Sequence, residues 1–90
     1  MQVIKQVGHF FLVKIGRKYH TVAHEPWTNK TWTVNRTDGD VRVADGWTAK
    51  AVQEVSKGRA KNTANIYFYQ TIARFKAEQR KLWSKEESAV

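Results

Sequence analysis

Basic side chains gather in one part of the chain and are its strongest chemical signal. Between Lys57 and Lys81 the only acidic residue is Glu78. The basic residues of this segment are Lys57, Arg59, Lys61, Arg74, Lys76, Arg80 and Lys81. Because their charges are largely uncompensated, we expect the segment to attract nucleic acid or an acidic protein surface.

The spacing of these residues indicates how they would contact phosphates. Lys57, Arg59 and Lys61 fall in a short connection between two expected helices, where a loop can follow a phosphate backbone. Tyr67 lies among the non-core positions of the second helix, and a ring beside basic groups can stack on a base. The connection also precedes the N-terminus of that helix, whose free N–H groups favour an anion. The sequence therefore predicts nucleic-acid binding, to DNA or RNA.

A protein partner is the alternative. Trp27 follows Pro26 in an expected loop and is the aromatic residue least explained by core packing. Trp, Tyr and Arg often anchor protein interfaces, so Arg36 and Arg42, near an expected turn, are possible protein contacts too. The alternative function is a small phage-type interaction module or inhibitor. It would dock its basic patch on an acidic surface of a host nucleic-acid-handling complex.

Residues suited to catalysis or metal binding form no recognisable pattern. His20 and His24 are four positions apart on an expected strand, about 13 Å by strand rise, which is too far to share one ion. The chain has no Cys, so it has neither a thiolate zinc site nor a cysteine nucleophile. Its five Gly residues are too dispersed to form a phosphate loop. We therefore expect a non-enzymatic protein with no catalytic residues, metal or cofactor.

The length and composition of the chain limit the kind of domain that can position these residues. The chain has 90 residues with 16 Lys and Arg against 8 Asp and Glu, a net charge of +8. We expect one basic domain over residues 1–90, with a frayed tail at 84–90. No apolar run of about 18 residues is present and the N-terminus does not resemble a signal peptide. No membrane segment is expected, and the cytoplasm is the expected location.

The first half of the chain predicts antiparallel strands. Residues 9–15 are apolar on both faces, which is typical of a central strand. If this segment lay at a sheet edge instead, it would be able to pair with a second copy of the chain; the sequence does not specify the oligomeric state. Pro26 lacks a backbone N–H and should end the strand before it.

A hairpin follows. Asp38-Gly39 predicts a two-residue loop that sets Val34 opposite Val43, with the apolar side chains on one half-buried face. The polar face would carry Thr31, Thr33 and Asn35. Such a face is able to hydrogen-bond base edges, which makes it a second possible binding surface.

Two helices complete the pattern. Thr48 is the expected N-cap of the first, and Gly58 is expected to end it in a left-handed conformation. The apolar stripe of the second helix is Ala64, Phe68, Ile72, Phe75 and Leu82. The sequence therefore predicts an α+β fold, in which an antiparallel sheet of about four strands in the N-terminal half packs against two C-terminal helices.

Overall fold

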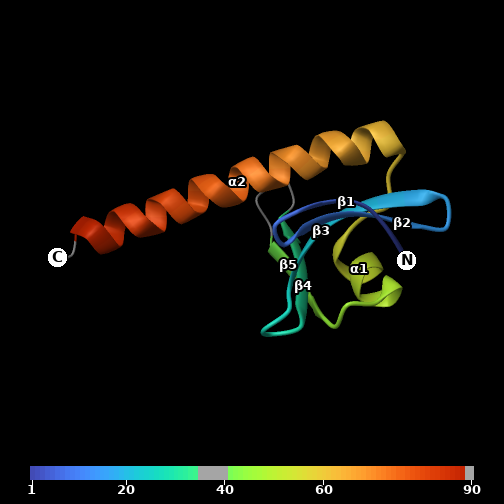
Figure 1. Ribbon diagram of the computed structural model, residues 1–90, viewed down its shortest axis with the longest axis horizontal. Coiled ribbons are helices and arrows are strands. Elements are labelled where there is room, and N and C mark those ends of the chain that lie inside the picture. The colour runs from blue at the N-terminus through green and yellow to red at the C-terminus, as the bar shows by residue number, and fades with distance from the viewer. Residues whose placement is uncertain (35–40, 89–90) are drawn as a thin grey trace.

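The computed structural model contains a five-stranded antiparallel sheet with one helix on each face (Figure 1). Its elements are β1 (Gln2–Val7), β2 (Phe10–Ile15), β3 (Lys18–Glu25), β4 (Lys30–Val34), β5 (Val41–Asp45), α1 (Ala49–Val55) and α2 (Lys61–Ser88). The structure describes residues 1–34 and 41–88, and the side chains of residues 1–33 and 41–76. The predicted α+β class is confirmed, and the sheet has slightly more strands than the four expected.

The order of strands in the sheet follows the chain, β1-β2-β3-β4-β5. Gly8 and Gly16 take φ values of 59° and 61° in the tight turns around β2, a conformation that glycine adopts without steric cost. β3 ends at Glu25, immediately before Pro26, as predicted. β2 pairs with β1 on one side and β3 on the other, so the predicted central strand is confirmed. Pairing of this strand with a second copy is therefore ruled out.

The β4–β5 hairpin has a different register from the predicted one. Val34 pairs with Val41, and Trp32 pairs with Val43, so residues 35–40 separate the paired ends instead of the two residues expected. A shift by two positions keeps the apolar side chains on one face. That face is less covered than expected, because Val41 and Val43 remain 57% and 56% exposed. β5 instead buries Ala44, on its opposite face.

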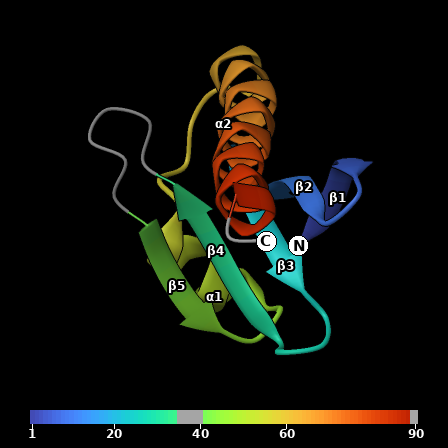
Figure 2. The ribbon, with the colours of Figure 1, turned by 90° about the vertical axis from the view of Figure 1, so that its left-hand side faces the viewer.

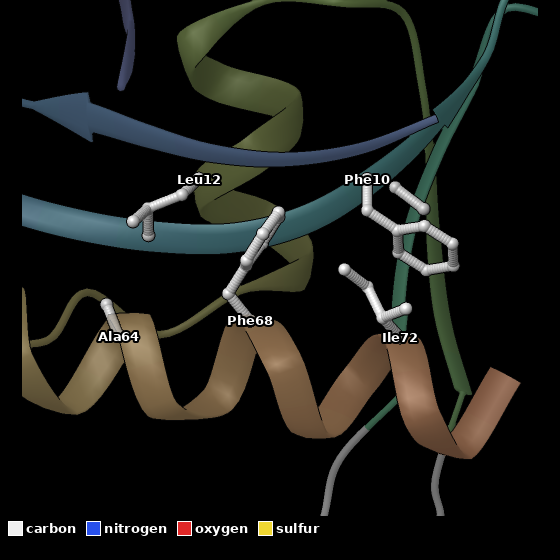
Figure 3. Packing of buried hydrophobic residues seen from close by; sticks show 6 residues of the cluster. Phe10, Leu12, Ala64, Phe68 and Ile72 are labelled. Carbon is white, nitrogen blue, oxygen red and sulfur yellow. The ribbon is translucent and has the colours of Figure 1, made fainter. Parts of the chain in front are cut away.

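Each face of the sheet has its own core. Under α2 the buried residues are Phe10, Leu12, Ala23, Ala64, Phe68 and Ile72 (Figure 3). Under α1 they are Val13, Val22, Ala44, Ala51, Val52 and Val55. The predicted stripe of α2 is confirmed as far as Phe75, which packs partly buried against the first core, and Leu82 lies outside the described side chains. The sheet is thus covered by α2 on one face and α1 on the other (Figure 2).

The two helices differ in how much of their length is packed. α1 begins at the predicted cap, where the Thr48 hydroxyl accepts a hydrogen bond of 3.1 Å from the Ala51 N–H. α2 continues well past the sheet (Figure 1). It includes residues up to Ser88, and the fraying expected for residues 84–90 stays a prediction.

Candidate functional site

The sheet divides between β3 and β4. These two strands pair only where residues 23–25 of β3 meet residues 30–32 of β4. Towards the start of β3, Tyr19 pairs instead with Arg59, which lies in the connection between the helices. Two backbone hydrogen bonds of 2.9 Å join Tyr19 and Arg59. Near the start of β3, the connection between the helices therefore lies beside β3 where β4 has diverged from it. We call the region where β4 and the connection diverge from each other the fork.

Gly58 allows the connection to lie this close to β3. A Cβ atom at Gly58 would lie 2.7 Å from Cβ of Lys18 and 3.2 Å from Cε1 of His20. The predicted left-handed C-cap at Gly58 is wrong, because its φ is not positive and Ser56 caps α1 with extended backbone. Close approach, and not an unusual dihedral angle, is what requires glycine here.

His20 holds the connection through a hydrogen bond to its first residue, Ser56. Its side chain is buried, and its Nδ1–H donates to the Ser56 carbonyl at 3.1 Å. Burial lowers the pKa of His20 below the usual 6.5, and the hydrogen bond to the Ser56 carbonyl opposes part of that shift. The imidazole is therefore neutral at physiological pH and acts as a structural support.

A cleft of about 200 Å³ lies in the fork. Its basic lining residues are Arg42 of β5 and Lys57 and Arg59 of the connection. Its hydroxyl-bearing lining residues are Tyr19, Thr21, Thr33, Ser56, Tyr67 and Thr71. None of the described residues that line it is Asp, Glu or His. The described side chains that line the cleft therefore carry a net positive charge, and none of them normally acts as a base near neutral pH.

Arg59 and Tyr67, which both line this cleft, form a cation–π contact. The guanidinium carbon of Arg59 lies 4.0 Å from the ring centroid of Tyr67. Both side chains are half-buried, and the backbone of Arg59 is fixed to β3 through Tyr19. A cation over an aromatic face is worth about 0.5–2 kcal/mol, depending on its exposure to water. The contact therefore holds the guanidinium group against the Tyr67 ring.

The fork brings together three of the residues predicted to bind nucleic acid, Lys57, Arg59 and Tyr67, and adds Arg42. Arg42 was predicted as a possible protein contact. Arg74 follows Tyr67 by seven positions, about 700° of helical rotation, so both lie on the same side of α2. Lys57, Arg59 and Tyr67 thus lie together at the cleft, and Arg74 lies on the same side of α2 as Tyr67.

Other predicted residues lie away from the cleft. Lys76 follows Tyr67 by nine positions, about 900° of rotation, which places it on the opposite side of α2. Lys61 begins α2 and is exposed, but it does not line the cleft. Arg36 and the side chains of Arg80 and Lys81 lie outside the described residues.

Trp27 is separate from the cleft as well. It lies in the turn between β3 and β4, at the opposite end of β4 from Thr33, and is 68% exposed. Its ring meets that of His9 edge to face at 4.9 Å. A partner that used both Trp27 and the fork would have to reach both ends of β4.

The three residues of the predicted polar face of the hairpin do not share one exposed surface. Thr31 is fully buried, and its hydroxyl bonds to the Gly46 carbonyl at 2.5 Å and to Nδ1 of His24 at 3.2 Å. Asn35 lies outside the described residues. Thr33 lines the fork cleft. The sequence missed Thr21 and Thr71 altogether, because a threonine that lines a cleft has the same sequence pattern as one on a solvated strand or helix.

Comparison with known proteins identifies no relative, since no protein-family model, no curated protein and no solved structure matches the chain. In the part of the chain that the structure describes, no helix is long and apolar enough to span a membrane. Nor do three His, Asp or Glu side chains gather there as metal ligands would. The function is therefore argued from the fork cleft and its surroundings.

Proposed function

We propose that the protein is a non-enzymatic, cytoplasmic nucleic-acid-binding domain that holds phosphates at the fork cleft. The observation that carries this proposal is the meeting of Arg42, from β5, with Lys57 and Arg59, from the connection between the helices, around one cleft without a carboxylate among its described lining. Basic groups at such a surface bind a phosphate backbone by displacing its condensed counterions. The absence of Cys from the chain suits a reducing compartment.

The basic surface extends beyond the cleft along α2. Arg74 lies on the same side of the helix as Tyr67, and Arg80 and Lys81 follow later in the sequence. The helix has 28 residues, which at about 1.5 Å per residue gives about 42 Å. A nucleic acid bound at the cleft would therefore have further basic groups within reach as it followed the helix.

The test is fluorescence anisotropy with labelled single-stranded DNA, duplex DNA and RNA over a range of salt concentrations. We expect micromolar or tighter binding near physiological salt, weakening steeply as salt rises. Replacing Lys57 with Ala should weaken binding and reduce the slope of log K against log salt by about 1. Weak binding that is alike for all three probes and disappears by about 0.15 M salt would overturn the proposal.

Lys76→Ala is the matched control. It removes the same charge from the exposed opposite side of α2, so it leaves the net charge equal to that of Lys57→Ala. Site-specific binding requires Lys57→Ala to weaken affinity clearly more than Lys76→Ala does. Equal losses would mean that only net charge attracts the nucleic acid.

The exposure of Trp27 favours a second candidate, a phage-type module that docks on an acidic protein surface. A large aromatic side chain that is 68% exposed is a typical anchor for a protein partner. In this case wild-type protein should capture a specific host protein from a lysate, and both Trp27→Ala and Lys57→Ala should lose it. Capture that neither substitution affects would contradict this candidate.

A further inference from the structure

We infer that the fork cleft receives an unstacked nucleobase from a single strand, while the basic groups at its mouth hold the neighbouring phosphates. This inference rests on the proposed function and specifies which form of nucleic acid the same site selects. It depends on three features of the cleft: the hydroxyl groups of Thr21 and Thr33, the arginine held against a tyrosine ring, and the size of the cleft.

Two hydroxyl groups of the cleft, those of Thr21 and Thr33, already donate their hydrogens within the protein. The Thr21 hydroxyl donates to the Ala64 carbonyl at 2.9 Å, and the Thr33 hydroxyl donates to the Thr21 carbonyl at 3.2 Å. A hydroxyl has a single hydrogen, so each of these groups presents only lone pairs to a ligand. Phosphate oxygens are acceptors too and gain nothing from them. The amino and N–H groups on the edge of a base are donors and fit them.

The positively charged side chains lie in a different part of the cleft from these acceptors. Lys57 and Arg42 are exposed and lie at the mouth of the cleft, whereas Thr21, whose hydroxyl already donates to Ala64, is buried on its inner side. The cleft therefore combines cationic donors outside with neutral acceptors inside. This order matches a nucleotide, whose phosphate is the charged part and whose base is the neutral part carrying N–H donors.

The Arg59–Tyr67 pair provides a planar surface for stacking. Unstacked bases commonly stack on arginine planes and aromatic rings in proteins that bind single strands. Arg59 is held in place by its 4.0 Å contact with Tyr67 and by both backbone hydrogen bonds to Tyr19. Little conformational freedom is then lost when a base binds. A base in a duplex is already stacked between its neighbours and cannot enter the cleft.

The size of the cleft fits one base. Its volume of about 200 Å³ lies below the roughly 300–1,000 Å³ of pockets that enclose a drug-sized ligand. It lies in the fork between β3, β4 and the helix connection, which the backbone pairing of Tyr19 with Arg59 holds in place. We therefore expect one base of a strand to enter while the rest of the strand remains outside.

The experiment compares three probes of equal length by fluorescence anisotropy at one salt concentration. They are a single strand, the same strand with abasic sites throughout, and a duplex of the same sequence. The abasic strand keeps every phosphate and loses only the bases. The intact single strand should bind on the order of tenfold more tightly than either of the others. Equal binding of all three would overturn this inference and leave the proposed function standing, whereas binding of none would overturn both.

The Arg59→Lys variant distinguishes a contact of Arg59 with a base from a contact with phosphate. Lysine keeps the positive charge and lacks the planar guanidinium group. We expect this variant to lose most of the preference for the intact strand and to bind the abasic strand as wild type does. An equal loss for both strands would mean that Arg59 contacts phosphate alone and would contradict the inference.

Thr33→Val provides an independent check, because valine has nearly the same shape as threonine and removes the acceptor. It should weaken binding of the intact strand and leave binding of the abasic strand unchanged. Thr63→Val, on the exposed first turn of α2, is its control and should change neither. Thermal unfolding of each variant confirms that it is folded, and a folded Thr33→Val protein that binds both strands like wild type contradicts the role of the hydroxyl.

Discussion

At the scale of single residues, His20 links the stability of the fold to pH. Burial lowers its pKa, so the unfolded chain binds the proton more tightly than the folded protein does. The contribution of neutral His20 to the free energy of unfolding is complete above the pKa of about 6.5 that His20 has in the unfolded chain. It decreases as pH falls from there towards the lower pKa of His20 in the folded protein. Urea unfolding between pH 5 and pH 8 should therefore show a falling free energy of unfolding below about pH 6.5.

His20→Asn tests the cause of this pH dependence. The asparagine amide is able to donate to the Ser56 carbonyl in place of Nδ1–H and does not titrate. Part of the decline below about pH 6.5 should disappear in this variant. An unchanged decline would assign it to other groups.

The residues of the fork show what sequence can and cannot reveal about a site. Lys57, Arg59 and Tyr67 were predicted because charge and aromaticity are visible in the sequence, and the structure places all three in one cleft. Thr21 and Thr33 were not predicted as a pair, because their neighbourhood depends on strands that diverge. Polar groups of ordinary type become recognisable as a site only when tertiary structure brings them together.

At the scale of elements, periodicity identified strands and helices well. The Thr48 cap, the strand end at Pro26 and the stripe of α2 from Ala64 to Phe75 all follow from local chemistry. The register of the β4–β5 hairpin was predicted wrongly, and the reason is physical. A shift by two residues returns every side chain to its original face, so the pattern of apolar residues is compatible with either register.

The fork was not predictable from local patterns either. It depends on the backbone pairing of Tyr19 with Arg59, which lie 40 positions apart in the sequence. The side chains of Tyr19 and Arg59 take no part in this pairing, which uses only their backbone N–H and C=O groups. Their residue types therefore do not indicate it. The glycine that makes the approach possible was visible, but its role was interpreted as a helix cap.

Gly58→Ala tests the packing of the connection against β3. The new Cβ would lie 2.7 Å from Cβ of Lys18, an atom close to the strand backbone that has little room to move. The connection should be pushed away, with a loss of about 1–3 kcal/mol in the free energy of unfolding and weaker binding of single strands. Urea unfolding and anisotropy measure the two effects.

Lys57→Ala is the comparison for this variant, since it should weaken binding without changing stability. The two variants together separate a misplaced connection from a missing charge. If Gly58→Ala were as stable as wild type and bound equally well, the close packing of the connection would have no part in forming the site.

At the scale of the whole molecule, α2 extends beyond the sheet that it covers (Figure 1). The longest dimension is 49 Å, and the described core residues of α2 lie between Ala64 and Phe75. We therefore expect a chain that lacks residues 79–90 to unfold cooperatively, with a free energy of unfolding within about 1 kcal/mol of the full chain. Circular dichroism during urea unfolding measures this.

The same truncation tests how the charges are used. Residues 79–90 hold three basic and two acidic side chains, so removing them lowers the net charge by one only. If Arg80 and Lys81 contact phosphates, the slope of log K against log salt should fall by up to about two, although the net charge hardly changes. The preference for an intact single strand over an abasic one should persist, because the cleft is complete without these residues. Loss of that preference in a cooperatively folded truncated chain would place the base-binding site on the end of α2 and not in the fork.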